Sequence, residues 1–93
     1  MHERTHMISA VQYGDIDDVK YVIRNGGNLN QEDCHMTPLK YAVSMKFELA
    51  VEVLIDAGAD VNYDGESGDT PLGLAIKRRF PRIEQMLRDA GAR

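Results

Sequence analysis

The residues best suited to chemistry stand together in one segment. Glu32, Asp33, Cys34 and His35 are consecutive, and their carboxylate, thiolate and imidazole groups can act as nucleophiles, bases or metal ligands. A catalytic cysteine, however, needs a histidine and an orienting group that meet it in space, and a structural zinc site needs a second ligand pair at a suitable spacing. The sequence offers neither. We therefore expect an exposed thiol in a loop, with no catalytic or metal-binding residues, no cofactor and no enzyme activity.

The basic run Lys77-Arg78-Arg79-Phe80-Pro81-Arg82 is the best candidate for contact with nucleic-acid phosphates. The chain carries a formal net charge of −4, and its acidic residues are concentrated in residues 1–69, while residues 70–93 are basic. The acidic part would repel a phosphate backbone. We therefore expect the basic run to solvate one end of the molecule, and nucleic-acid binding is kept as the weaker alternative.

The composition is that of one small folded domain. The chain has 93 residues, of which 43% are hydrophobic and 28% are charged, and this balance is ordinary for a globular protein. The single cysteine excludes an internal disulfide, which fits a reducing compartment. No apolar run is long enough to suggest a signal peptide or a membrane span, so we expect a cytoplasmic protein with no membrane partner.

A short motif that returns at a fixed spacing indicates a stack of similar units. Thr37-Pro38-Leu39 returns as Thr70-Pro71-Leu72, and the Gly-Ala-Asp-Val-Asn of residues 58–62 has a counterpart in the Gly-Gly-Asn-Leu-Asn of residues 26–30. The offset between the first two units is slightly smaller than that between the second and third, because one loop is shorter. The motif itself predicts a helix start, since threonine caps a helix and proline fits its first position.

Apolar side chains recur at helical spacing within each unit and predict two helices per unit. Glycines end these helices, because glycine readily takes the left-handed conformation just after a helix. The predicted helices begin at Thr5, Asp15, Thr37, Phe47, Thr70 and Pro81, and glycines at 14, 26, 58 and 91 close four of them.

These repeated segments resemble the ankyrin repeat, whose pattern is Thr-Pro-Leu-His-x-Ala, a turn, a second helix and Gly-Ala-Asp-Val-Asn. The resemblance implies an all-α fold, an ankyrin-repeat solenoid of stacked helix-turn-helix units with β-turn or hairpin loops. It covers one domain, residues 1–93, with unit 1 at about residues 5–36, unit 2 at about 37–69 and unit 3 at about 70–93. Unit 1 lacks the full motif and is interpreted as a cap.

The resemblance also implies that a protein partner binds along the loop tips and the inner helices. Carried over to this sequence, the implied protein-binding residues are Tyr13, Glu32, Asp33, Met36, Tyr41, Met45, Asp64, Glu66, Asp69, Leu74, Lys77 and Arg78. Tyrosine and methionine would supply apolar anchors and the acidic tips would attract a basic protein surface. We expect a small adaptor or inhibitor that uses no small-molecule substrate and is a monomer or self-associates weakly. The alternative is a piece of a longer ankyrin array, or a self-associating unit.

Overall fold

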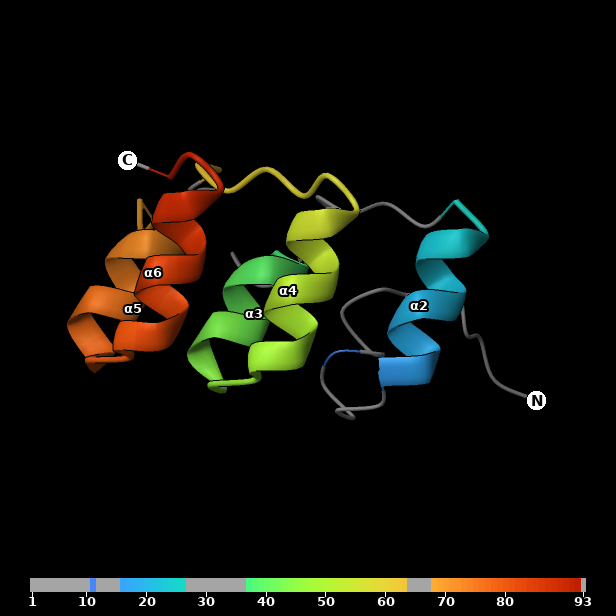
Figure 1. The fold of residues 1–93 in the computed structure, drawn as a ribbon, viewed down its shortest axis with the longest axis horizontal. Coiled ribbons are helices and arrows are strands. Elements are labelled where there is room, and N and C mark those ends of the chain that lie inside the picture. Colours follow the sequence, from blue (N-terminus) through green and yellow to red (C-terminus); the bar gives the residue numbers. More distant parts are fainter. Residues whose placement is uncertain (1–10, 12–15, 27–36, 64–67, 93) are drawn as a thin grey trace.

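The computed structural model describes residues 11, 16–26, 37–63 and 68–92, and these residues form stacked pairs of short helices (Figure 1). Helices α3 and α5 pack against each other in one layer, and α2, α4 and α6 follow one another in a second layer. Their bounds are α2 Ile16–Arg24, α3 Pro38–Ser44, α4 Glu48–Asp56, α5 Pro71–Arg78 and α6 Pro81–Asp89. The described residues contain no strand. This arrangement confirms the all-α fold of stacked helix-turn-helix units.

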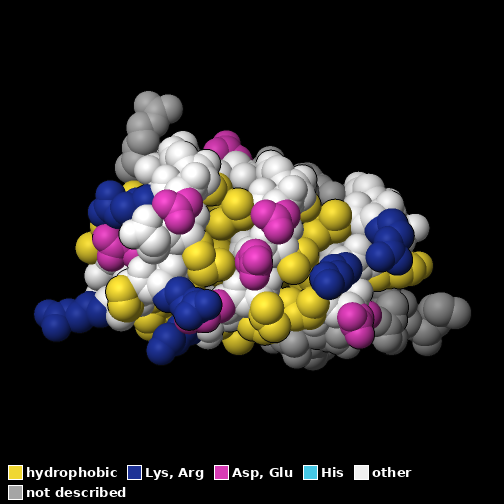
Figure 2. Space-filling view, in the orientation of Figure 1, with side chains coloured by type: hydrophobic (Ala, Val, Ile, Leu, Met, Phe, Trp, Pro, Cys, Tyr) yellow, Lys and Arg dark blue, Asp and Glu magenta, His cyan; other side chains and the backbone are white. Residues whose placement is uncertain are grey.

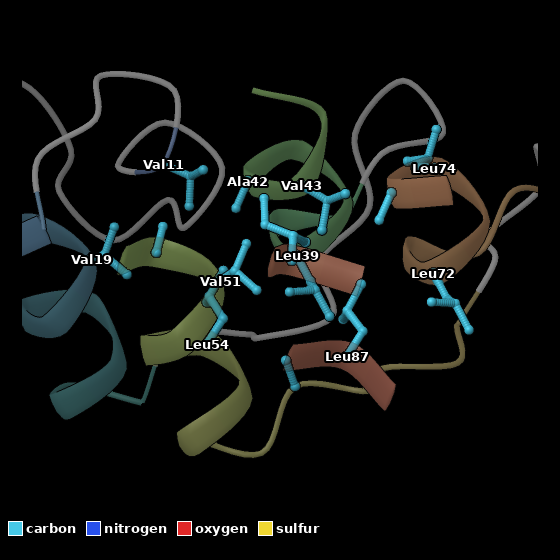
Figure 3. Packing of buried hydrophobic residues seen from close by; sticks show 14 of the residues in the cluster. Val11, Val19, Leu39, Ala42, Val43, Val51, Leu54, Leu72, Leu74 and Leu87 are labelled. Atoms are coloured by element: carbon cyan, nitrogen blue, oxygen red, sulfur yellow. The ribbon is translucent and has the colours of Figure 1, made fainter. Parts of the chain in front are cut away.

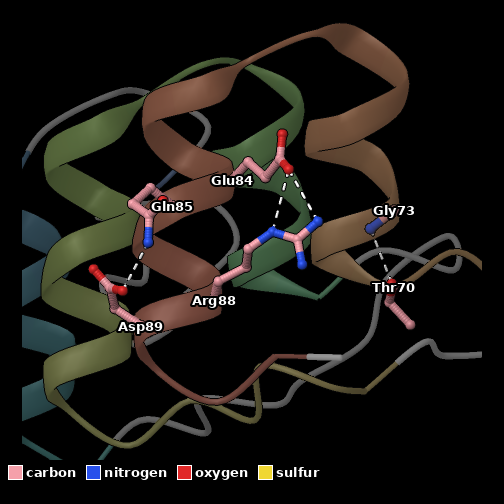
Figure 4. A network of polar contacts seen from close by, with 6 residues as sticks. All are labelled: Thr70, Gly73, Glu84, Gln85, Arg88 and Asp89. Atoms are coloured by element: carbon pink, nitrogen blue, oxygen red, sulfur yellow. Dashed lines mark hydrogen bonds and ion pairs between the residues drawn. The ribbon is translucent and has the colours of Figure 1, made fainter.

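The predicted helix starts at the two Thr-Pro motifs are confirmed. Thr37 and Thr70 have extended backbones, and each hydroxyl oxygen accepts a hydrogen bond from the backbone N–H three residues on, at Lys40 (3.2 Å) and Gly73 (3.0 Å). Figure 4 shows the second of these bonds. Each threonine thus satisfies a backbone donor that the first helical turn leaves without a partner.

The predicted first helix and the loop tips fall mostly outside the described residues. In the segment that begins at Thr5, the structure describes Val11 alone, which is helical and fully buried. The segment with Cys34 and His35 lies outside the described residues, as do most of the predicted hairpin tips.

The core runs as a continuous strip between the two helical layers. Figure 3 shows its valines, leucines and alanines converging from neighbouring helices. Leu54 and Leu87 hold equivalent positions on α4 and α6, in successive units, and both are fully buried. The helical spacing of apolar residues therefore translates into one shared core.

The turn between the two helices of a unit contains a feature that the sequence analysis did not predict. Lys46 and Arg79 have φ values of 57° and 62°, in the left-handed region that glycine prefers. They are equivalent positions, so the same turn is built twice. The Arg79 N–H donates to the carbonyls of α5, and this cap closes the helix.

Replacing Arg79 with glycine should stabilise the protein by about 0.5–1 kcal/mol, because a left-handed conformation costs a residue with a Cβ about 1–2 kcal/mol and glycine loses more chain entropy on folding. Lys46→Gly should gain less, since the Lys46 ammonium lies 5.6 Å from the centre of the Phe80 ring and glycine removes this contact. Urea denaturation followed by circular dichroism measures both free energies. A loss of stability in Arg79→Gly would contradict the strain argument.

Contacts outside the core tie unit 2 to unit 3. Besides the contact between Lys46 and Phe80, Arg82 lies 3.4 Å from a carboxylate oxygen of Glu48. The side-chain amide of Asn62 donates to the backbone carbonyl of Gly91 at 3.4 Å. These contacts fix how one unit lies on the next, although the ion pair is exposed and contributes little to stability.

Candidate protein-binding surface

Half of the predicted binding residues lie within the described part of the chain. Tyr41 lies in the middle of α3 and Met45 directly follows that helix, while Leu74, Lys77 and Arg78 belong to α5 and Asp69 precedes it. Six more, Tyr13, Glu32, Asp33, Met36, Asp64 and Glu66, lie outside the described residues. The structure therefore describes the part of the predicted site on and beside the inner helices α3 and α5.

The inner helices bring the predicted residues into two parallel rows. Met45 and Arg78 are equivalent positions in successive units, as are Tyr41 and Leu74, and α3 packs directly on α5. Met45 follows the last turn of α3 and is 50% exposed, which makes it one of the largest exposed hydrophobic side chains of the described residues. Tyr41 is partly buried against the core. Met45 and Tyr41 are the apolar residues of this part of the predicted site, and Lys77 and Arg78 are the basic residues in the last turn of α5.

Leu74 differs from the other predicted surface residues. It is only 8% exposed and belongs to the hydrophobic core. Because its side chain is almost fully buried, Leu74 helps to hold α5 on the core and offers little surface to a partner.

The charged residues of this region are partly paired. The Lys77 ammonium lies 3.5 Å from a carboxylate oxygen of Asp69, and both side chains are about half exposed or more. Such a pair contributes little to stability but orders the two side chains. Arg78 and Arg79 are exposed beside it, so this end of the stack presents positive charge.

The part of the chain that the structure describes has neither a metal-binding cluster nor a membrane-spanning helix. Within residues 16–26, 37–63 and 68–92, no group of three histidine, cysteine, aspartate or glutamate side chains is placed to hold a metal ion. No described helix is both long and apolar enough to cross a membrane.

An exposed leucine on the second helical layer is not among the residues predicted from the sequence to bind a partner. Leu49, on α4, is 59% exposed. The equivalent positions in units 1 and 3 are Asp17 and Arg82, both charged. This internal comparison was available in the sequence, and it indicates that the fold does not require an apolar residue at this position.

Comparison with known families decides which architecture this is. The family model "Ankyrin repeats (3 copies)" matches residues 7–93. The chain belongs to the ankyrin repeat family. Ankyrin repeats generally serve as protein-interaction modules rather than catalysts, so the family supports a protein-binding role.

A solved ankyrin repeat structure has the same fold. An ankyrin repeat domain from Acinetobacter baumannii AYE superposes with a TM-score of 0.86 at 31% identity, covering 94% of this chain and 47% of the other.

Curated relatives contain similar ankyrin repeats within larger proteins. The human 2-5A-dependent ribonuclease is 41% identical over 71 residues, which is 74% of this chain and 10% of the relative. The potassium channel SKOR of Arabidopsis thaliana is 39% identical over 87 residues, which is 92% of this chain and 10% of the channel. The chain thus spans about a tenth of the length of these relatives.

Proposed function

We propose that this ankyrin repeat chain is a protein-binding module, a small adaptor or inhibitor that grips its partner with the inner-helix face and the acidic loop tips. The observation that carries the proposal is the half-exposed side chain of Met45, directly after α3 and four residues from the partly buried Tyr41. A large apolar side chain with half its surface in water gains free energy when a partner covers it. The neighbouring charged residues would form the polar rim of such an interface.

The chemistry of the partner follows from the charges. Acidic residues dominate the sequence up to residue 69, so a basic protein surface would be attracted to this part of the molecule. Opposite charges mainly raise the rate of association, whereas the apolar anchors slow dissociation.

The experiment is capture of partners from the native cells with the tagged chain, followed by mass spectrometry, with Met45→Asp as the matched variant. A partner that uses the inner face should be retained by the wild type and bind at least tenfold more weakly to Met45→Asp. Reversing the charges of Glu32, Asp33, Glu66 and Asp69 should slow its association at low salt. Equal binding of that partner by wild type and Met45→Asp would refute the inner-face site.

A second candidate function, self-association or membership of a longer array, is favoured by one residue. Ile76 on α5 is 48% exposed, whereas its equivalent on α3, Val43, is fully buried in the core where α5 packs on α3. A further ankyrin unit or a second copy would cover Ile76 in the same way. Light scattering on a size-exclusion column tests this function: a wild-type dimer that becomes a monomer in Ile76→Lys would support it.

Nucleic-acid binding by the basic run has less support. Lys77 faces Asp69 and Arg82 faces Glu48, so acidic partners already engage two of the bases. These pairs favour the interpretation that the run solvates this end of the stack.

A further inference from the structure

The second helical layer has an exposed apolar residue that folding does not explain. Leu49 is 59% exposed, and the same position is aspartate in unit 1 and arginine in unit 3. Two of the three units therefore have a charged side chain at this position and still form the same helix. A leucine at such a position suggests contact with something outside the fold.

Leu49 stands on the edge of a groove of about 480 Å³ between α4 and α6. The groove lies on the face seen in Figure 2, where hydrophobic side chains gather between the helices and acidic side chains stand beside them. Its apolar lining comes from four residues, Leu49, Ile55, Met86 and Ala90. Its acidic lining comes from four more, Glu48, Glu52, Asp56 and Asp89, against a single base, Arg82.

The acidic residues that line the groove outnumber its one base, so the groove is negatively charged around its apolar residues. Arg82 is engaged with Glu48 at 3.4 Å, and the Asp89 carboxylate accepts a hydrogen bond from the Gln85 side chain at 2.8 Å (Figure 4). A neighbouring groove between α2 and α4 shares Leu49, Glu52 and Asp56, but it balances the two acids with Lys20 and Arg24. Net negative charge thus distinguishes the groove between α4 and α6.

We propose that the groove between α4 and α6 docks a short, basic, amphipathic helix of a partner protein. The apolar floor would receive leucine-like side chains spaced by three or four residues, and the acidic rim would pair with lysine or arginine on the flanks of that helix. Each groove helix has nine residues and is about 13 Å long, which matches two to three turns of a bound helix.

This inference rests on the proposed function only in that both require a protein partner. It assigns a different face, the second helical layer, whereas Tyr41 lies in the inner helix α3 and Met45 directly follows it. Among the described residues there is no strand edge to which an extended peptide could add, so a helical ligand fits better than a β-strand.

The test uses a synthetic peptide of leucine and lysine, about four helical turns long with leucines on one face, and a scrambled peptide of the same composition. Binding is measured by fluorescence anisotropy, and the site by amide shift changes in nitrogen-15 spectra. We expect the amphipathic peptide to bind more tightly than the scrambled one, with shifts at Leu49, Met86 and Ala90.

Two variants with the same change in charge give the matched comparison. Leu49→Arg introduces the residue type that unit 3 has at this position, and it should weaken binding of the amphipathic peptide at least tenfold. Ile76→Arg replaces another exposed aliphatic residue, which lies on α5 and is not part of the groove lining, and it should leave the affinity within twofold. Circular dichroism checks that both variants fold, and Leu49→Gln replaces Leu49→Arg if that variant does not.

Several outcomes would overturn the inference. Equal weakening by both variants would mean that the peptide senses overall charge alone. Shifts centred on Tyr41 and Met45 would leave the proposed function standing and exclude the groove. Self-association that disappears in Leu49→Arg would assign the groove to a second copy of the chain.

Discussion

Leu54→Ala should lower the free energy of unfolding by about 3 kcal/mol, which is more than half of the stability expected for the whole domain. Leu54 is fully buried on the central helix α4, so its truncation loses apolar burial and leaves a cavity, which together cost about 2–5 kcal/mol. A domain of this size has a total stability of roughly 5 kcal/mol. The central position adds to the effect, because unit 2 contacts the units on both sides.

Urea denaturation followed by circular dichroism measures this loss. The matched control is Leu49→Ala, the same chemical change on the same helix at an exposed position, which should shift stability by less than about 0.5 kcal/mol. If both variants unfold at the same urea concentration, the packing of α4 described above is wrong.

Gly58→Ala should destabilise the protein by about 1–3 kcal/mol, although the substitution adds only a methyl group. Gly58 has a φ of 99°, and the space around its Cα is open, so the cost comes from the backbone and not from a clash. The residue closes α4, and its N–H donates to the Ile55 carbonyl. Thermal and urea melts should both move downward.

Gly73→Ala is the matched control and should act in the opposite direction. Gly73 lies inside α5, where alanine favours the helix by up to about 1 kcal/mol. A Cβ there would lie 3.2 Å from the Thr70 hydroxyl oxygen. Lys40 shows that this position tolerates a side chain, because its N–H still donates to the Thr37 hydroxyl at 3.2 Å. Destabilisation by Gly73→Ala would show that crowding against the Thr70 hydroxyl outweighs the helix preference of alanine.

The parts of the fold that depend on local chemistry could be predicted from the sequence. Thr-Pro at 37–38 and 70–71 sets helix starts through side-chain capping and a fixed φ, and both effects act within one helical turn. The recurrence of the motif then predicted the stack. The left-handed turns at Lys46 and Arg79 were missed, because neither residue type signals a positive φ and the packing of the two helices imposes it.

The candidate surface was less predictable, because exposure depends on what neighbouring units cover. Leu74 and Met45 are both apolar residues in the inner layer, yet one is core and the other is half exposed. The helical spacing of apolar residues does not predict which of the two is buried, because burial depends on the neighbouring units. Comparing equivalent positions in the three units would have singled out Leu49, because only unit 2 has an apolar residue there.

The exposed Ile76 also bears on how such a chain can change by mutation of its gene. Val43, the equivalent residue of unit 2, is fully buried, and α5 of unit 3 packs on the helix that carries it. If one whole unit were duplicated in frame after unit 3, the new unit could therefore cover the exposed side chain of Ile76. Growth of the protein by whole units is thus a short mutational step, whereas most insertions of other lengths would have to be absorbed in a loop.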